Sequence, residues 1–387
     1  MKQSVVFLII CLVCLSMSLT SPIPIVKATE DTWTTLAPMP TTRINFGVVA
    51  VEGKIFAIGG HSWTHDYLDI NEMYDPVTNT WIEKAPMPTP REGFGIAVYK
   101  NKIYVIGGAI GVDPSGNGNA LITTANEAYD PVTDTWETKA PMPTLRHGVT
   151  ASVADGRIYV ISGFEHTNNS YRGLNHGSIK NESYDPETNT WSNKPSIPNG
   201  VFHAVSATIG DKIYVLGGAK ADLAISGWSN YNQVYDIKQE TWTQASPVPV
   251  GFDRAAGAAI LGVEPRIFIF GGSIAPSYDS CNLTQIYNPQ QDNWTYGSQM
   301  PTSRASLGVA VIDNEFYAIG GYTKNLKPWS NLNEKYTPDK TLIPEIPNLL
   351  VLTPIIISIS FATILYLRKS KNIADKSQKN NRLKTYK

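Results

Sequence analysis

Arginines recur at a fixed spacing along this chain, and guanidinium groups have a definite chemistry. Four of them each come ten residues after a tryptophan: Arg43, Arg91, Arg146 and Arg304. Arg254 comes twelve residues after another tryptophan, two residues late, in a repeat with a short insertion. A guanidinium donates paired hydrogen bonds to a carboxylate or phosphate, so arginines on one surface would bind an acidic ligand. In the alternative, they bond carbonyl oxygens or the acidic side chains of Glu72, Glu127 and Glu182.

Aromatic residues gather in segments that vary in length and content along the chain. These residues are Trp63, Tyr67, Tyr171, Trp228, Tyr231, Tyr278 and Trp329. They stand among asparagine, serine and glycine, which supply adaptable hydrogen bonds, and this combination is typical of surfaces that bind proteins or sugars. In the alternative, the rings pack beneath their own loops and serve only the fold.

A repeat of about fifty residues must position these side chains. Six tryptophans mark it: Trp33, Trp81, Trp136, Trp191, Trp242 and Trp294. A glycine pair, or once Ser162-Gly163, follows each of them, and a tyrosine precedes the next tryptophan. Between these markers, segments such as Ile55–Ile58 are short, β-branched or aromatic and bounded by turn residues, which predicts strands. Six copies in register predict a repeat architecture.

The repeat resembles the kelch motif from Asp31 to Pro338, on phrases such as Tyr129–Trp136 (YDPVTDTW) and Lys102–Gly108 (KIYVIGG). The resemblance implies an all-β fold, a six-bladed β-propeller with four strands in each blade. It also implies that two sets of loops emerge on one face, those between second and third strands and those that lead into the next blade. That face would carry the arginines, the loop aromatics and the histidines.

The two ends of the repeat region complement each other. Trp33 has no tyrosine or glycine pair before it, and Tyr336 has no tryptophan after it. A strand at Trp33 to Ala37 would therefore complete the blade that contains Arg304 and Tyr336. We expect the propeller to be closed in this way by the N-terminal strand, because closure leaves no exposed sheet edge at the seam.

The flanks predict export and a membrane anchor. Residues 1–29 have a charged start and a short apolar run, which is typical of a signal peptide. After a linker over 339–348, residues 349–367 form an uncharged apolar stretch of spanning length, which predicts a transmembrane helix. The basic tail 368–387 is then cytoplasmic, because lysine and arginine are enriched in the segments that flank a transmembrane helix on the cytoplasmic side. Pro344–Pro347 is similar to sorting signals of archaeal surface proteins, so removal of the helix stays an alternative.

Charge and sequons narrow the partners of the exported region. From Asp31 to Asn348 there are 22 basic and 31 acidic residues, a net charge of −9. An acidic domain without a basic stripe argues against nucleic acid. Export would allow glycosylation at the sequons of Asn168, Asn181, Asn282 and Asn293. The region keeps one cysteine, Cys281, so we expect no internal disulfide.

Metal and cofactor sites are not expected. We expect the histidines to lie in exposed loops without a metal. The ligand set of the kelch copper-radical oxidases cannot be assembled around Cys281 alone. Asp113–Asn119 mimics the start of a calcium loop but has one carboxylate and lacks the glutamate at the twelfth position. We therefore predict no metal and no cofactor.

These observations favour a binding module over an enzyme. We expect a single-pass cell-surface protein, with the propeller outside, that recognises a protein or a glycan through variable loops on one face. A sugar-active enzyme, resembling the six-bladed sialic acid mutarotases or less closely the copper oxidases, is the alternative. A structural component of a surface layer is a third. The sequence does not name the ligand, the oligomeric state or the signal cleavage site.

Overall fold

The computed structural model describes residues 31–64, 66–112, 120–165, 177–220, 228–275, 279–324 and 329–339. Within these ranges every regular element is a strand, which confirms the all-β prediction. None of the described residues belongs to a helix long and apolar enough to cross a bilayer. The predicted signal peptide, the transmembrane helix, the basic tail and the linker beyond Asp339 lie outside the described residues.

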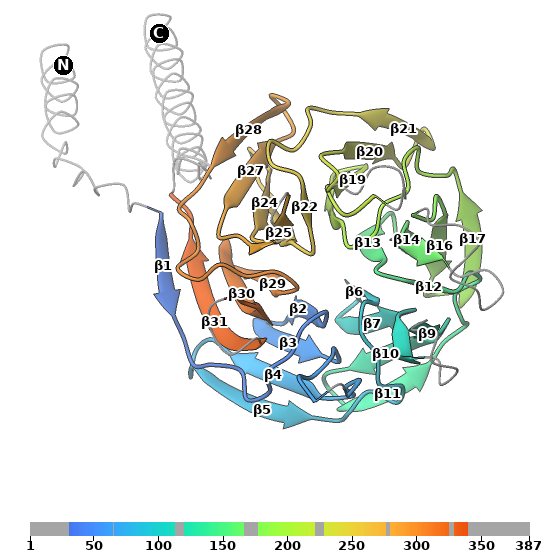
Figure 1. Ribbon diagram of the computed structural model, residues 1–387. Helices are drawn as coiled ribbons and strands as arrows, with labels where there is room; N and C mark the ends of the chain where they lie inside the picture. The colour runs from blue at the N-terminus through green and yellow to red at the C-terminus, as the bar shows by residue number, and fades with distance from the viewer. Residues whose placement is uncertain are drawn as a thin grey trace, which may run out of the picture. The chain divides into compact units, whose positions relative to one another are not determined.

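The strands form four-stranded antiparallel sheets, and Figure 1 shows them arranged around a common centre. The innermost strands are β2 (Gly47–Val51), β6 (Gly95–Tyr99), β13 (Thr150–Ala154), β18 (Val205–Ile209), β23 (Ala256–Ile260) and β29 (Gly308–Ile312). The second strands are β3 (Lys54–Ile58), β7 (Lys102–Ile106), β14 (Arg157–Ile161), β19 (Lys212–Leu216), β24 (Arg266–Phe270) and β30 (Glu315–Tyr322).

The outer half of each sheet carries the repeated tyrosine and tryptophan. The third strands are β4 (Asn71–Asp75), β10 (Asn126–Asp130), β16 (Asn181–Asp185), β20 (Asn232–Asp236), β27 (Thr284–Asn288) and β31 (Trp329–Thr337). The outermost strands are β5 (Thr80–Lys84), β11 (Thr135–Thr138), β17 (Thr190–Lys194), β21 (Thr241–Gln244), β28 (Asn293–Tyr296) and, from the N-terminus, β1 (Thr32–Thr35).

Short additional strands lie in the loops between second and third strands. One hairpin joins β8 (Ala109–Val112) to β9 (Ala120–Ile122). Two further groups pair these loops with the segments that lead into the innermost strands: β12 (Arg146–His147) with β15 (Phe164–Glu165), and β22 (Phe252–Asp253) with β25 (Ser273–Ile274) and β26 (Asp279–Ser280). These pairings tie both loop sets to the same face.

Local sequence explains the inner hairpins. The second strands are apolar and buried, for example Ile55 to Ile58 in β3. The turn from β13 to β14 has two central residues, Asp155 and Gly156, with φ of 45° and 70°. Positive φ at both positions matches the twist of the strands, and aspartate and glycine tolerate it. The second strand is therefore held tightly against the first.

The repeated aromatic residues lie between neighbouring sheets. The rings of Tyr74 and Trp81 are 5.0 Å apart, and Tyr74 also packs against Tyr317 of the preceding sheet at 6.2 Å. The indole Nε1 of Trp81 donates to the carbonyl of Ala37 at 2.9 Å, and Trp136 repeats this bond with Ala85. These rings are thus structural, since each one joins two sheets through burial and a hydrogen bond.

The N-terminal strand pairs with the last strand of the chain. In the β1–β31 register, Trp33 lies opposite Tyr336, and their rings are 5.0 Å apart. The Asp31 carboxylate accepts hydrogen bonds from the backbone N–H groups of Ser298 at 3.1 Å and Asp339 at 2.6 Å. β1 therefore occupies the outermost place in the sheet of β29, β30 and β31 (Figure 1).

Candidate functional site

The repeated arginines Arg43, Arg91, Arg146 and Arg304 lie inside the sheets and not on the loop face. Each of these four side chains is 0% exposed. Their partners are the third-strand glutamates, with Arg91–Glu127 at 2.5 Å and Arg146–Glu182 at 2.6 Å. Burial lowers the pKa of Arg43 to about 10, against the opposing effect of Glu72. The expectation that these arginines display their guanidinium groups for a ligand is corrected, because buried charges need internal partners.

Each of these arginines also donates to two or three backbone carbonyl oxygens. Arg43 donates to the carbonyls of Gly59 and Ala57 at 3.1 Å, and Arg304 donates to that of Ala318 at 3.0 Å. Together with the glutamate, these acceptors satisfy most of the guanidinium donors. The four arginines therefore join the second and third strands of their sheets.

Two sheets lack this ion pair, and both partners change together. Val201 and Phe252 take the arginine's place, and both are 0% exposed. The glutamate is replaced in these sheets by Gln233 and Gln285. The Gln233 carboxamide instead accepts from the Asn199 backbone N–H at 2.9 Å. A neutral amide suits this place because a buried carboxylate without a cation is unfavourable.

Arg254 does not belong to the arginine position. Phe252 lies ten residues after Trp242, so no insertion precedes Arg254, which lies two places further along. The extra residues of this repeat lie in the turn between β23 and β24. That place in the six repeats is held by Asn45, Gly93, Gly148, His203, Arg254 and Ser306, which we call the mouth ring. Every member has a positive φ, from 52° at Asn45 to 60° at Gly148.

The mouth ring surrounds one end of the central channel. Backbone hydrogen bonds join five of the six neighbouring pairs of members. The shortest, at 2.6 Å, runs from the Gly148 N–H to the Gly93 carbonyl, and the longest, at 3.2 Å, from the Asn45 N–H to the Ser306 carbonyl. The ring lines a cavity of about 120 Å³. The backbone conformation at this position is the same in all six repeats, and the side chain differs. The ring therefore presents different chemical groups from one backbone geometry.

Asp253 lies behind the mouth ring as a buried acid. Its carboxylate accepts a hydrogen bond from Arg254 at 2.7 Å and lies 3.1 Å from Nδ1 of His203. The Asp253 side chain is 1% exposed, whereas that of Arg254 is 39% exposed. Burial opposes ionisation, but His203 and Arg254 still hold the pKa of Asp253 below its usual range. The carboxylate therefore orients an imidazole and a guanidinium at the mouth, where the guanidinium can bind a ligand and the imidazole can bind one or transfer a proton.

A second group lies on the same face, and we call it the aromatic corner: His61, Trp63, Tyr67, Glu92 and Trp329. The Trp63 and Trp329 rings are 5.8 Å apart with their planes at 87°. The His61 ring lies 5.3 Å from Trp329 and 5.0 Å from Tyr67. The His61 Nδ1 atom lies 3.9 Å from a Glu92 carboxylate oxygen. The corner thus joins residues from the β3–β4 loop, from β31 and from the segment before β6.

Glu92 and Asn45 connect the aromatic corner to the mouth ring. The Asn45 carboxamide donates to Glu92 at 3.0 Å. Burial and the adjacent Glu92 carboxylate raise the pKa of Tyr67 to about 12, so its hydroxyl stays protonated.

Trp63 is 58% exposed, and the other tryptophans are at least partly buried. Neither Glu92 nor Asp253 is among the residues expected from the sequence, although both lie one place after the arginine position in their repeats.

The remaining aromatic candidates are less prominent. Trp228 pairs through its backbone with Ala219, and Tyr231 packs against the core between two sheets. The Lys220 ammonium lies 4.6 Å from the centre of the Tyr231 ring. Tyr171 and Tyr278 lie outside the described residues.

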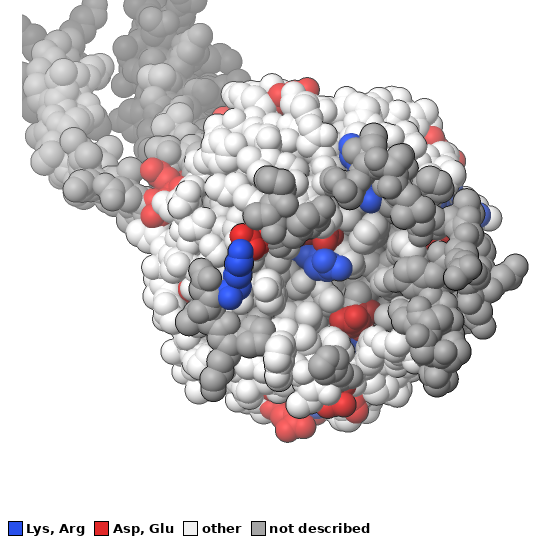
Figure 2. All heavy atoms as spheres, in the orientation of Figure 1, with Lys and Arg blue, Asp and Glu red and all other residues white. Residues whose placement is uncertain are grey.

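Figure 2 shows few charged side chains on the face toward the viewer, and some of its basic and acidic atoms lie directly together.

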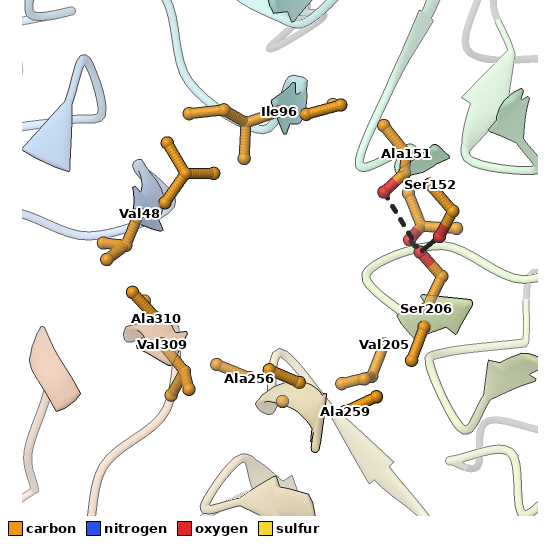
Figure 3. Close-up of a pocket in the computed structure, with 18 of the residues that line it drawn as sticks. Val48, Ile96, Ala151, Ser152, Val205, Ser206, Ala256, Ala259, Val309 and Ala310 are labelled. Carbon is orange, nitrogen blue, oxygen red and sulfur yellow. Dashed lines mark hydrogen bonds between the residues drawn. The ribbon is translucent and has the colours of Figure 1, made fainter. Parts of the chain in front are cut away.

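The central channel is lined mainly by small apolar side chains, as Figure 3 shows for Val48, Ala256 and Ala310. Its volume is about 520 Å³. Hydroxyl groups occupy one side, where the Ser152 hydroxyl donates to that of Ser206 at 2.8 Å. Innermost strands crowd around the axis, so small residues fit this position.

The predicted sequons differ in accessibility. Asn181 is 2% exposed, and its side chain donates to the carbonyl of Pro195 at 3.3 Å. This fold has no room for a glycan there, so the sequence prediction for Asn181 is corrected. Asn282 is partly buried and Asn293 is exposed. Asn168 lies outside the described residues.

Within the described ranges, no three histidine, cysteine, aspartate or glutamate side chains converge as a metal site. Cys281 is a free, buried thiol, and burial raises its pKa. The calcium-like segment 113–119 and the histidines at 65, 166 and 176 lie outside the description.

The comparisons with known proteins agree with this geometry. The KLHDC2/KLHL20/DRC7 Kelch-repeats domain matches residues 128–321, and the Kelch motif matches residues 42–88 and 90–143. The structure of YjhT is similar with a TM-score of 0.64 and 17% identity, covering 77% of this chain and 95% of that one. At this identity the likeness shows the fold alone.

Two curated proteins illustrate the sequence similarity. Kelch-like protein terF of Aspergillus terreus is 28% identical over 221 residues, which cover 54% of this chain and 46% of that protein. Kelch-like protein 36 of Bos taurus is 24% identical over 294 residues, which cover 73% and 44%. The chain thus spans less than half the length of each of these relatives. The domain match, the motif matches and the repeated sheets together show that this chain belongs to the kelch-repeat family.

Proposed function

We propose that this chain is a binding module that recognises a protein ligand on the face formed by the mouth ring and the aromatic corner. The observation that carries the proposal is the exposure of Trp63, at 58%, on a framework of paired strands. An exposed indole beside partly buried aromatic rings is typical of the centre of a binding surface. The buried arginines hold the framework, so affinity would come from the side chains that vary between repeats.

Site-specific crosslinking on intact cells tests the proposal. A photoreactive residue at Thr64, next to Trp63, should give one dominant adduct with the full-length chain. The matched control is the same residue at Val77, which is 87% exposed in the turn between β4 and β5. The adduct should disappear on changing Trp329 to Ala and persist on changing Tyr296 to Ala. Equal adducts from both positions would contradict a specific face.

A glycan is the second candidate ligand of this face. It is favoured by the hydrogen-bonding groups of Asn45, Ser306 and Glu92 near the aromatic rings, since sugar sites combine such groups with exposed rings. A glycan array with the purified full-length chain tests this candidate. Saturable binding that is lost in the Trp63→Ala variant would support a glycan ligand. An array without binding would favour a protein as the ligand of this face.

The enzyme alternative rests on His203 and Asp253. A carboxylate that orients an imidazole is the arrangement of a general base. We therefore propose sugar turnover as a lesser candidate, tested by NMR of sugar anomers with and without the protein. Exchange accelerated by the wild-type chain and lost in His203→Gln would support catalysis, and identical rates would exclude it for those sugars.

We also propose that the sheets form a closed six-bladed ring whose seam is sealed by β1. The pairing of Trp33 with Tyr336 supports closure, because it puts the N-terminal strand into the last sheet. A cysteine pair at Thr34 and Lys335, which are partners in the β1–β31 register, would test it by disulfide formation. A thiol pair that stays reduced under oxidation would contradict closure.

We infer that the propeller is displayed outside the cell on a single C-terminal helix, with residues 368–387 inside. The apolar stretch 349–367 and the basic residues after it support this topology. Protease treatment of intact cells tests it, with tags at the C-terminus and after residue 339. We would have to reverse this topology if, on intact cells, the tag after residue 339 resisted protease and the C-terminal tag were digested.

A further inference from the structure

The shape of the aromatic corner restricts what it can bind. The Trp63 and Trp329 rings pack edge to face, with their centres 5.8 Å apart and their planes at 87°, so they form an angular corner and not a flat platform. A sugar ring stacks most fully on one flat aromatic face, whereas a compact cation can contact two rings at once. The His61 ring lies 5.3 Å from Trp329 and extends the aromatic wall toward Glu92.

The charges around the corner are negative. The Glu92 carboxylate lies 3.9 Å from His61 and is fixed by the Asn45 carboxamide at 3.0 Å. Asp66 lies on the same loop as Trp63 and is exposed. Nearby carboxylate charge adds to the attraction that the indole faces exert on a cation. The predicted ectodomain as a whole carries a net charge of −9, which favours approach of a positive group.

The neighbouring basic side chains on this face are paired. Lys324 lies on the loop before Trp329, and its ammonium is 2.6 Å from the Asp279 carboxylate of the adjacent sheet. Arg254 of the mouth ring is held by Asp253 at 2.7 Å. These pairs balance the positive charges near the corner. Among the ion pairs of the described residues, the Glu92 carboxylate has one partner, the His61 imidazole, and has neither a lysine nor an arginine.

We propose that the aromatic corner is a binding site for an alkylammonium group, supplied by a lysine side chain or the N-terminal amine of a protein ligand. The cation would lie in the angle between the two ring planes, against both Trp63 and Trp329, with Glu92 as its acidic partner. This inference rests on the proposed function, because it names the chemical group that the ligand presents. A free amine is also what an acidic, aromatic surface selects over a neutral peptide.

Fluorine NMR of the full-length chain labelled with 5-fluorotryptophan tests the proposal. The Trp63→Phe and Trp329→Phe variants assign the two signals, and the remaining tryptophan signals report whether each variant is folded. The probes are Nα-acetyl-lysine methylamide, its Nε-acetylated form as the neutral match, and alanine methylamide as a model of a chain N-terminus. The lysine and N-terminal probes distinguish the two sources of the amine.

We expect saturable shifts of the Trp63 and Trp329 signals with at least one amine probe and none with the Nε-acetylated form. The Glu92→Gln variant should weaken binding roughly tenfold, because it removes the charge and keeps the shape. The matched control is Glu83→Gln, which removes an exposed carboxylate from β5 and should leave binding unchanged.

Two results would overturn the inference. One is the absence of saturable shifts with both amine probes, and the other is an equal response to the Nε-acetylated form. If neutral sugars shift the same signals while amines do not, the corner is a glycan site. If the Thr64 crosslink persists in any of these cases, the binding face stands and only the ammonium assignment fails.

Discussion

Trp33 and Ser298 are 265 positions apart in the sequence, yet the Trp33 indole Nε1 donates to the Ser298 carbonyl at 3.0 Å. Trp294 makes the equivalent bond to Ser246 at 2.9 Å one sheet earlier. The first tryptophan of the chain therefore makes the same contact with its neighbouring sheet as the internal ones. This equivalence places the N-terminal strand in the repeat.

The first prediction concerns this strand. Deletion of residues 31–40 should lower the melting temperature by about 10 °C or more, since it removes a strand and several kcal/mol of packing. Thermal unfolding of the full-length chain followed by tryptophan fluorescence measures the effect. The matched control is Trp63→Ala, which removes an exposed indole and should leave the melting temperature nearly unchanged. An unchanged melt after the deletion would rule out a stabilising role for β1.

The second prediction concerns the buried ion pairs. Changing Glu182 to Gln leaves the Arg146 charge buried without an acid, and should destabilise the fold by about 3–5 kcal/mol. The double variant Arg146→Val with Glu182→Gln copies Val201 and Gln233 of the next sheet, so it should recover most of the loss. Urea unfolding measures both. A double variant as unstable as the single one would contradict the electrostatic explanation.

A converse variant checks the same idea in the sheet that lacks the pair. Changing Gln233 to Glu introduces a buried carboxylate opposite Val201, which supplies no cation. The variant should be destabilised at neutral pH and recover as acid protonates the new carboxyl group. Equal stability at pH 7 and pH 4 relative to the parent would argue against this account.

The covariation of these pairs shows what the sequence can predict. Counting ten residues from each tryptophan identifies Val201 and Phe252 as the neutral members. Counting two residues back from each repeated tyrosine identifies Gln233 and Gln285 as their partners. The strands and repeated aromatic residues also follow from local pattern. The same count places Phe252 at the arginine position and Arg254 in the mouth ring, because the insertion in this repeat comes after Arg254.

The aromatic corner could not be predicted in this way. Trp63 and Trp329 lie near opposite ends of the chain, and no periodic pattern relates them. Their contact depends on how the first and last sheets pack, so it is a property of the assembled fold. Glu92 has a fixed place in its repeat, directly after Arg91, but that place does not indicate which distant side chains it contacts.

The third prediction is a loss of stability in acid. The Tyr129 hydroxyl and the Ala85 backbone N–H hold the pKa of Asp134 below its ordinary value of 3.8. Burial opposes ionisation of Asp292, but Tyr287 and Ser246 hold its pKa below the ordinary value as well. A lowered folded pKa means that this stability is present above the unfolded value and is lost as the pH falls through the folded value.

Asparagine fills the same role in two other sheets, where Tyr74 donates to Asn79 and Tyr184 donates to Asn189, both at 2.7 Å. The double variant Asp134→Asn with Asp292→Asn should therefore keep most of the neutral stability and lose stability less steeply below pH 4. Urea midpoints from pH 7 to pH 3 measure the slope. Parallel curves for variant and parent would exclude these two carboxylates as the cause.

The fourth prediction tests the packing of the mouth ring at Gly148. Its φ is +60°, and a Cβ there would lie 2.9 Å from Cδ2 and Nε2 of His203. Gly210 has a φ of +56° with nothing within 4 Å of an added Cβ, so it is the matched control. Gly210→Ala should lose about 1 kcal/mol from backbone strain alone. Gly148→Ala should lose about 1–3 kcal/mol more, since the His203 ring must shift.

The same variant connects packing to the site. A displaced His203 ring would move away from the Asp253 carboxylate, which now lies 3.1 Å from Nδ1. Histidine-selective NMR spectra of the wild type, Gly148→Ala and Gly210→Ala should then show a shifted ring signal for one imidazole in Gly148→Ala only. If the two variants lose equal stability and give the same imidazole signals, the mouth ring does not hold the His203 ring in place for a ligand.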